Sequence, residues 1–339
     1  MPTDVGRTGL DCYLLHGLVV RSEVALGTMP VRDPGVGIDL DYLVGEARVV
    51  PALPPAGEVV ARALHKDDVS RSFFTAARRS SGYIVRIHGL CDLEFDDAVS
   101  RAVCHLDPSG DPALVAVHLT GVVLAFAFGL RGQAVAHASA VTLPGTDDEV
   151  VALAGSSGVG KSTVAALLCA LGCGFVTDDL LRFDVLDRHV VTVGGAPELR
   201  LRDGAVHVLD AFVAPGPPRR DTADGRVALH LASGDRTRRA LRAIVVPAPD
   251  RVGTSVTLER LRPADALLLL ARSPKLDGWL LPGVVRGQFD ALARLAEVTP
   301  AFVARLPWLP GPDAETARQL LEALRRVLDE PAVLPGALS

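Results

Sequence analysis

The chain has 339 residues, of which 22% are charged and 49% hydrophobic, and a formal net charge of −5. This length allows one large domain or two. The mildly acidic net charge argues against a nucleic-acid partner, because nonspecific binding to nucleic acid requires a positively charged surface. Five scattered cysteines without zinc-type spacing indicate free thiols in a reducing compartment. Residues 1–4 carry no sign of a secretory signal peptide, so we expect a cytoplasmic protein.

The first part of the chain, from residue 10 to about 110, reads as short β-like runs separated by turns. Residues 14–22 form one such run, and in residues 82–89 apolar and polar side chains alternate. The sequence therefore predicts a smaller, β-rich N-terminal domain, residues 1–130, followed by a catalytic domain, residues 131–339. A peptide-binding surface is the simplest use for such a β-rich domain.

Residues 112–130 are apolar and about as long as a minimal membrane span. His118, Thr120 and Gly121 interrupt the run, and no basic cluster precedes it. A buried core helix at the end of the N-terminal domain is therefore favoured over a membrane span, and we expect no membrane partner.

Residues 155–162 match a complete phosphate-binding motif, G-x-x-x-x-G-K-S. A buried strand is predicted before it, at 149–154, and a helix after it, from Lys161 to residue 171. This order supports the motif, because loop amides and a helix N-terminus attract phosphate. We therefore expect ATP as cofactor, with Lys161 on its β- and γ-phosphates and Ser162 on Mg²⁺. The expected nucleotide contacts are Gly155, Ser156, Ser157, Gly158, Val159, Gly160, Lys161, Ser162 and Thr163.

A second strand, residues 174–177, is predicted to end at two adjacent carboxylates, Asp178 and Asp179. Adjacent carboxylates at a strand end point in different directions, so one can hold Mg²⁺ while the other faces an acceptor hydroxyl. The sequence does not decide which is the base and which the metal ligand. An acidic turn or helix cap is the alternative, and a site that binds nucleotide without chemistry also stays open.

Further core strands are predicted at 190–193 and 241–247, and an amphipathic helix at 317–328. Residues 211–240 contain a Pro- and Gly-rich segment and a charged loop, both of which we expect to be mobile.

Four side chains after the Asp pair are candidate substrate contacts. Arg236 and Arg238 would contact substrate if the 211–240 loops form a lid, and a solvated surface is the equally weighted alternative. Glu198 and Arg200 are weaker candidates, because a solvated alternating strand is the default explanation for them.

Three parts of the chain together resemble the catalytic domain of the HPr serine kinase/phosphorylase family. They are residues 137–141 (His-Ala-Ser-Ala-Val), the loop 155–163, and Gly172 with residues 177–179 (Thr-Asp-Asp), and the resemblance covers about residues 131–330. It implies an α/β fold with a P-loop kinase core of the HPr kinase / phosphoenolpyruvate carboxykinase type. It also implies a catalytic role for His137, beside the base of the Asp pair, although alone this histidine would more often be structural.

The N-terminal run that begins at Tyr13 is more similar to the divergent HPr-kinase-like proteins of peptide-biosynthesis clusters, the lasso-peptide kinases among them. That resemblance implies a precursor peptide as the acceptor, phosphorylated on a serine. Ser156 and Thr163 stand where the bifunctional enzymes usually carry Asp and Glu, and the glycine-rich signature of those enzymes is not recognisable at 194–208. These departures argue against phosphorylase activity and against HPr as the acceptor, and they leave a homo-oligomer open.

The resulting hypothesis is an ATP- and Mg²⁺-dependent kinase that phosphorylates a serine, or less often threonine, hydroxyl of a peptide or small protein. A kinase of a small molecule, such as a free amino acid or sugar, shares this chemistry and is the first alternative. A regulator that senses ATP without turnover is the second. The identity of the acceptor is not written in the sequence.

Overall fold

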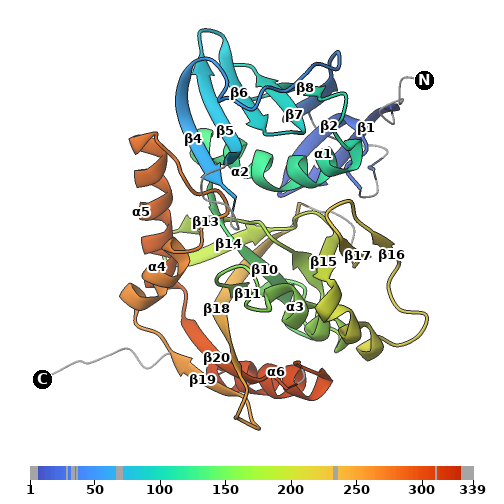
Figure 1. The fold of residues 1–339 in the computed structure, drawn as a ribbon. Helices are drawn as coiled ribbons and strands as arrows, with labels where there is room; N and C mark the ends of the chain where they lie inside the picture. The colour runs from blue at the N-terminus through green and yellow to red at the C-terminus, as the bar shows by residue number, and fades with distance from the viewer. Residues whose placement is uncertain are drawn as a thin grey trace, which may run out of the picture.

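The computed structural model describes residues 7–27, 30–31, 35, 37–65, 72–231, 236–309 and 311–329. Over these residues the chain is a mixed α/β protein whose strands form three sheets (Figure 1). The first sheet lies at one end of the molecule and the second and third at the other, so the chain has an upper and a lower part in this view. The candidate site lies where these parts meet.

The first sheet has eight strands, in the order β1-β2-β3-β8-β7-β6-β5-β4. They are β1 (Arg7–Leu15), β2 (Leu18–Val24), β3 (Leu40–Val44), β4 (Glu58–Leu64), β5 (Ser72–Arg79), β6 (Gly82–Ile87), β7 (Cys91–Phe95) and β8 (Arg101–Leu106). Strands β4 to β8 form an antiparallel meander, whereas β3 is parallel to both its neighbours. Alternation of apolar and polar residues predicts β6 correctly.

The run 14–22 is a hairpin and not one strand, which corrects the sequence-based expectation. The chain reverses at His16 and Gly17, whose φ angles are +53° and +78°, and Leu15 pairs with Leu18. Two consecutive residues with positive φ give the two-residue turn whose twist suits a hairpin. Glycine adopts this conformation freely, but histidine seldom does, so the sequence carries only half of the usual turn signal.

The buried imidazole of His16 makes the stability of this fold depend on pH. Burial, followed by the charges of Arg182 and Lys275, lowers the pKa of His16 to about 3, against an ordinary value of 6.5. Below pH 6.5 the unfolded chain therefore binds a proton that the native state excludes. The stabilisation is complete above that pH and is lost as the pH falls toward the folded pKa.

We expect the free energy of unfolding to fall by about 2 kcal/mol from this one group between about pH 7.5 and about pH 5. Urea denaturation at the two pH values measures the difference. The variant His16→Asn keeps a side chain that tolerates positive φ but does not titrate, so it should lack this share of the pH dependence. An unchanged pH dependence in His16→Asn would contradict the assignment.

Residues 112–130 form one continuous helix, made of α1 (Pro112–His118), the π-helical turn η1 (Leu119–Val123) and α2 (Leu124–Leu130). Asp111 caps its N-terminus, where the carboxylate accepts a hydrogen bond from the Ala113 amide at 2.9 Å. By length and composition this helix could cross a membrane, and 61% of its most apolar window is buried inside the protein. It lies against the first sheet as a core helix, with Phe126 and Phe128 fully buried.

The second sheet follows the order β12-β10-β11-β18-β14-β13-β9, and β18 also pairs with β20, which pairs with β19. Its strands are β9 (Ala134–Ala136), β10 (Ala138–Thr142), β11 (Glu149–Ala154), β12 (Phe175–Thr177), β13 (Leu181–Leu186), β14 (His189–Val193), β18 (Arg238–Asp250), β19 (Thr257–Arg260) and β20 (Ala301–Pro307). The strands expected at 149–154, 174–177, 190–193 and 241–247 correspond to β11, β12, β14 and the middle of β18.

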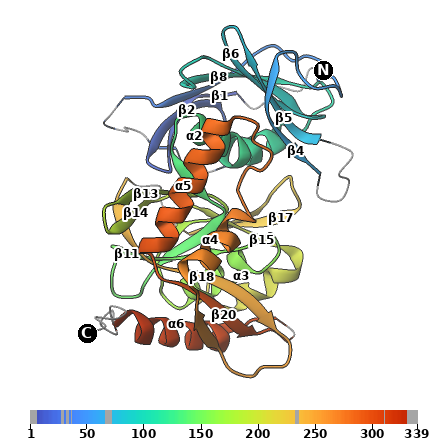
Figure 2. The same cartoon turned by 90° about the vertical axis from the view of Figure 1, so that its left-hand side faces the viewer.

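Helices cover both faces of the second sheet (Figure 2). They are α3 (Lys161–Ala170) and α6 (Ala314–Asp329) on one face, and α4 (Pro263–Ala271) and α5 (Pro282–Val298) on the other. Strand β11 is therefore buried on both sides, with Val151 and Leu153 toward α3 and Val150 and Ala152 toward α4 and α5. Burial on both faces explains why this strand reads as an uninterrupted apolar run. The amphipathic helix expected at 317–328 is α6.

Part of the segment expected to be loop is a sheet, which corrects the prediction for 211–240. Within it, β17 (Arg226–His230) is the middle strand, paired on one side with β16 (Arg219–Asp221) and on the other with β15 (Glu198–Arg202), which η2 (Asp203–Ala211) follows. Short strands between Pro and Gly residues show no clear periodicity, and their pairing with β15 is non-local. Residues 233–235 of the charged loop lie outside the described residues.

Candidate active site

Three neighbouring strands of the second sheet bring the candidate residues to one edge. Strands β11 and β12 flank β10 and are both antiparallel to it, so they end at the edge where β10 begins. The glycine-rich loop follows β11, the Asp pair follows β12, and His137 precedes β10. The antiparallel pairing of β10 with both neighbours thus brings His137 close to the glycine-rich loop and to the Asp pair. These residues lie 18 to 42 positions from His137 in the sequence (155 − 137 and 179 − 137).

The glycine-rich loop turns from β11 into α3 through residues with positive φ. Gly155, Gly158 and Gly160 have φ angles of +132°, +88° and +98°, a region that residues with a side chain seldom adopt. The Lys161 ammonium folds back over the loop and donates hydrogen bonds to the Gly155 and Ser156 carbonyls, at 2.8 and 3.1 Å. The loop is therefore a compact turn around a buried lysine at a helix N-terminus.

We expect Gly160→Ala to weaken nucleotide binding by roughly tenfold or more and to lower the free energy of unfolding by about 1–3 kcal/mol. A Cβ at Gly160 would lie 2.2 Å from a ring carbon of Trp308, in addition to the strain of its positive φ. The measurements are ATP titration and denaturant unfolding. Gly132→Ala is the matched control, because Gly132 has a φ of +68° but no atom within 4 Å of a new Cβ. Equal losses in the two variants would contradict a role for Trp308.

The Asp178 carboxylate accepts three hydrogen bonds, two from hydroxyl groups and one from a backbone N–H. Its Oδ1 accepts hydrogen bonds from the Ser139 and Ser162 hydroxyls, at 2.5 and 2.8 Å. Its Oδ2 accepts from the Arg200 backbone N–H at 3.1 Å. Ser162 lies in the first turn of α3 and Asp178 lies just after β12. Their side chains therefore meet at Asp178 Oδ1.

Asp179 points to a different set of groups, all of them cationic or titratable. Its carboxylate contacts His137 Nε2 at 3.3 Å, one Arg200 guanidinium nitrogen at 3.2 Å, and the Lys275 ammonium. The backbone at Asp179 has a φ of +72°, a conformation that aspartate tolerates better than most residues. The two carboxylates after β12 thus have different partners, as expected for adjacent positions, although Arg200 contacts both.

The charges around Asp179 keep its carboxylate ionised. Burial alone would raise its pKa, but Lys275, His137 and Arg200 together hold the pKa of Asp179 well below its usual range. Burial lowers the pKa of His137 more than Asp179 raises it, so the imidazole is neutral at pH 7. Burial and the charges of Lys275 and Arg200 likewise lower the pKa of His118 to about 4.

These groups line a cavity of about 530 Å³ that extends from the glycine-rich loop to the Asp pair. Its wall includes Lys161, Ser162 and Thr163 from α3, and Trp308 after β20. Arg200 and Arg202 of β15, with Arg226 of β17, also line the cavity and add positive charge to it. The volume falls in the usual range of small-molecule and cofactor sites.

The structure brings together most of the residues that the sequence nominates. His137, Lys161, Ser162, Asp178, Asp179 and Arg200 all line this cavity. Glu198 faces a second cavity on the far side of the Asp pair. Arg236 and Arg238 line neither: Arg236 donates to the Gly17 carbonyl at 3.1 Å, and Arg238 pairs with Asp184 at 3.1 Å.

Sequence reasoning missed Lys275, which contacts Asp179 from the segment between α4 and α5. A signal was present in the composition. Lysine and arginine together number 35, yet lysine occurs only as Lys66, Lys161 and Lys275 in the whole sequence. In a chain that uses arginine almost everywhere else, a lysine indicates a site where a compact ammonium is needed.

The site does not contain a ready-made metal cage. Among the described residues, no group of three or more His, Cys, Asp or Glu side chains is arranged to hold a metal ion. Mg²⁺ does not require such a cage, because it is commonly held by one or two carboxylates together with phosphate oxygens and water. Asp178 and the Ser162 hydroxyl, 2.8 Å apart, fit that donor set.

Comparison with known proteins does not assign the chain to a family. No known protein family matches the chain, and no curated protein matches it either. Among solved structures, an Hpr(Ser) kinase/phosphatase from Coxiella burnetii aligns over 57% of this chain and 95% of its own, at 8% identity and a TM-score of 0.29. An identity and a TM-score this low assign no function to the chain.

Proposed function

We propose that the protein is an ATP- and Mg²⁺-dependent kinase that transfers the γ-phosphoryl group to a hydroxyl, with a P-loop kinase core around β11 and α3. The observation that carries the proposal is that Ser162 and Asp178 are hydrogen-bonded to each other while the neighbouring Asp179 has a separate set of cationic partners. One carboxylate can then hold the metal and the other can receive the acceptor. Phosphoryl transfer needs both functions beside a phosphate cradle.

Each residue of the site has a part in this chemistry. The loop amides and Lys161 would hold the nucleotide phosphates, and Ser162 with Asp178 would hold Mg²⁺. When bound, Mg²⁺ neutralises charge that develops on the phosphates. Lys275, Arg200 and Arg202 supply further positive charge around the cavity, where transferring phosphoryl oxygens become more negative.

We assign the role of base to Asp179. Its carboxylate lies where the glycine-rich cavity and the neighbouring one meet, so it can accept a hydrogen bond from an attacking hydroxyl and orient it toward the phosphoryl group. Asp178 is already committed to Ser139, Ser162 and the backbone of β15. The neutral imidazole of His137 orients Asp179 without competing for the same proton.

The proposed acceptor is a serine, or less often threonine, of a peptide or small protein in the cytoplasm. The test is incubation with γ-labelled ATP, Mg²⁺ and a degenerate peptide library that contains one fixed serine, followed by mass spectrometry for the added phosphate. We expect acceptor-dependent release of ADP and phosphoserine. Tight ATP binding without transfer to any peptide or small hydroxyl compound would sink the proposal and favour an ATP sensor.

A further inference from the structure

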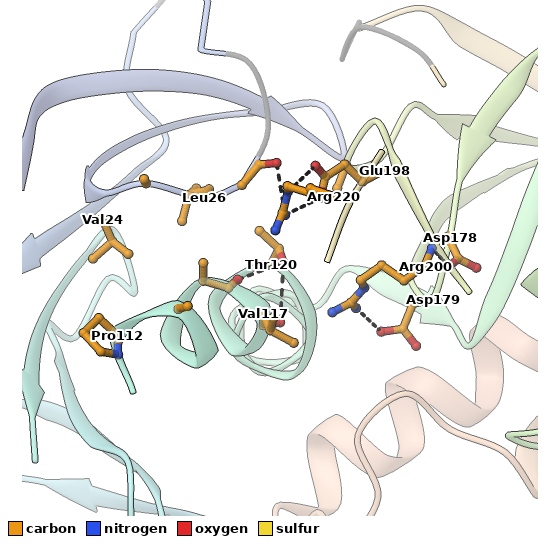
Figure 3. A pocket seen from close by; sticks show the side chains of 15 residues that line it. Val24, Leu26, Pro112, Val117, Thr120, Asp178, Asp179, Glu198, Arg200 and Arg220 are labelled. Atoms are coloured by element: carbon orange, nitrogen blue, oxygen red, sulfur yellow. Dashed lines mark hydrogen bonds and ion pairs between the residues drawn. The ribbon is translucent and has the colours of Figure 1, made fainter. Parts of the chain in front are cut away.

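A second cavity, of about 390 Å³, meets the first one at the Asp pair (Figure 3). Asp178, Asp179, Arg200 and Val117 line both cavities. In the close-up, Arg200 and Asp179 lie at one end, and Pro112 and Val24 lie at the other. A molecule in this second cavity would therefore reach Asp179 from the side opposite the glycine-rich loop.

Residues from both the upper and the lower part of the molecule line the second cavity. The segment that ends β2 contributes Val24 and Leu26, helix α1 contributes Pro112 and Ala116, and Ala196 lies just before β15. These five side chains are all aliphatic, and in the close-up Val24, Leu26 and Pro112 lie away from Asp178 and Asp179 (Figure 3). The hydroxyl of Thr120, in the π-helical turn, donates a hydrogen bond to the Ala116 carbonyl at 3.0 Å. Its hydrogen is therefore not available to a bound molecule.

The charged side chains in this wall already have partners within the protein. Arg220 of β16 forms two hydrogen bonds with the Glu198 carboxylate, at 3.1 and 2.7 Å, and a third with the Gly27 carbonyl at 3.2 Å. Arg200 is shared between Asp179 and Asp224. A charged group on a bound molecule would therefore compete with these internal pairs for a counter-charge, which favours an uncharged occupant.

Arg220 also closes the cavity between the two parts of the molecule. It belongs to the third sheet, and the Gly27 carbonyl that it contacts follows the first sheet. The wall thus has an apolar floor on α1 and a roof formed by the Glu198–Arg220 pair. An extended chain can lie between them with one side chain at Asp179.

We propose that this second cavity is the acceptor site, and that it takes an uncharged peptide segment in which an aliphatic residue neighbours the serine or threonine. The hydroxyl lies at Asp179, and the aliphatic neighbour lies against Val24, Leu26 and Ala116. A free amino acid has the hydroxyl but nothing to occupy the distant part of the cavity. This inference rests on the proposed kinase function and adds its substrate class.

The first test narrows the cavity without touching the catalytic groups. Ala116→Leu adds bulk to the half-buried position on α1 that lines the cavity, in a helix that accepts leucine readily. We expect its KM for peptide to rise roughly tenfold or more, while its KM for ATP stays at the wild-type value. Ala264→Leu, at an exposed helical alanine outside both cavities, is the matched control and should change neither constant.

The second test determines the neighbour preference, using a library of capped peptides with one serine and varied flanking residues. Wild-type protein should phosphorylate peptides with Leu, Ile or Val beside the serine roughly tenfold or more faster than those with Asp or Lys. An unchanged peptide KM in Ala116→Leu, indifference to the flanking residue, or equal rates on free serine would overturn the acceptor site alone. Absence of transfer to every library member would remove the kinase function and this inference together.

Discussion

Replacing Asp179 with asparagine is expected to lower kcat for phosphoryl transfer by about 10³-fold while ATP still binds. The amide keeps the size of the side chain but cannot take the proton of the attacking hydroxyl. It also removes the negative charge that Lys275 and Arg200 now share. Single-turnover kinetics with a peptide acceptor, together with ATP titration, separate the chemical step from nucleotide binding.

Stability provides a second measurement for the same variant. In Asp179→Asn, two largely buried cations, Lys275 and Arg200, lose a shared counter-charge, so the unfolding free energy should fall by about 1–3 kcal/mol. Bound ATP should restore part of it, because phosphates bring negative charge to the same cavity. The control is Asp224→Asn, which removes another partner of Arg200 without touching the carboxylates after β12. Wild-type kcat in Asp179→Asn would show that Asp179 is not the base.

The sequence predicted the part of the site that is local in the chain. The strand before residue 155, the glycine loop and helix α3 are adjacent elements, so their motif and periodicity are visible together. The Asp pair follows soon after, and its position at a strand end was correctly expected. What the sequence left open was the division of labour between Asp178 and Asp179, because that division depends on which way each side chain points.

Lys275 and Arg220, which reach the two cavities from distant segments, were not predicted. Lys275 reaches Asp179 from 96 positions further along the chain, and its position carries no motif. Arg220 lies in a strand of only three residues, too short to show a period, between a Pro-rich turn and Gly225, so its segment looked like a loop. Charge alone suggested Arg236 and Arg238 instead. In the structure these two arginines pair with groups outside both cavities, Gly17 and Asp184.

The apolar helix 112–130 also lines the two cavities, which its composition does not indicate. Its hydrophobicity reflects burial against the first sheet, with Phe126 and Phe128 in the core. Its other side supplies Ala116 and Val117 to the second cavity and Gly121 to the first, beside Lys275. A sequence pattern reports the buried face of such a helix strongly, whereas the few small residues that shape a cavity leave no periodic signal.

Asp178→Asn is expected to lower kcat/KM by about 10²-fold or more and to raise the Mg²⁺ concentration needed for half-maximal activity. The amide can still accept one hydrogen bond, but it lacks the charge that holds a divalent cation. If its oxygen keeps the Arg200 backbone N–H, its NH2 group faces the Ser139 and Ser162 hydroxyls, so the oxygen that would hold the cation beside Ser162 is lost. Titration of activity with Mg²⁺ at saturating ATP measures the effect.

Variants of Ser162 test whether Asp178 acts through the same ion. Ser162→Thr keeps the hydroxyl and should retain most activity, whereas Ser162→Ala should share the raised Mg²⁺ requirement of Asp178→Asn. Groups that hold one ion act as a unit, so the double variant should lose much less than the product of the two single losses. Losses that multiply would mean that Asp178 and Ser162 act independently. The 2.8 Å contact between them would then be a structural hydrogen bond and not half of a metal site.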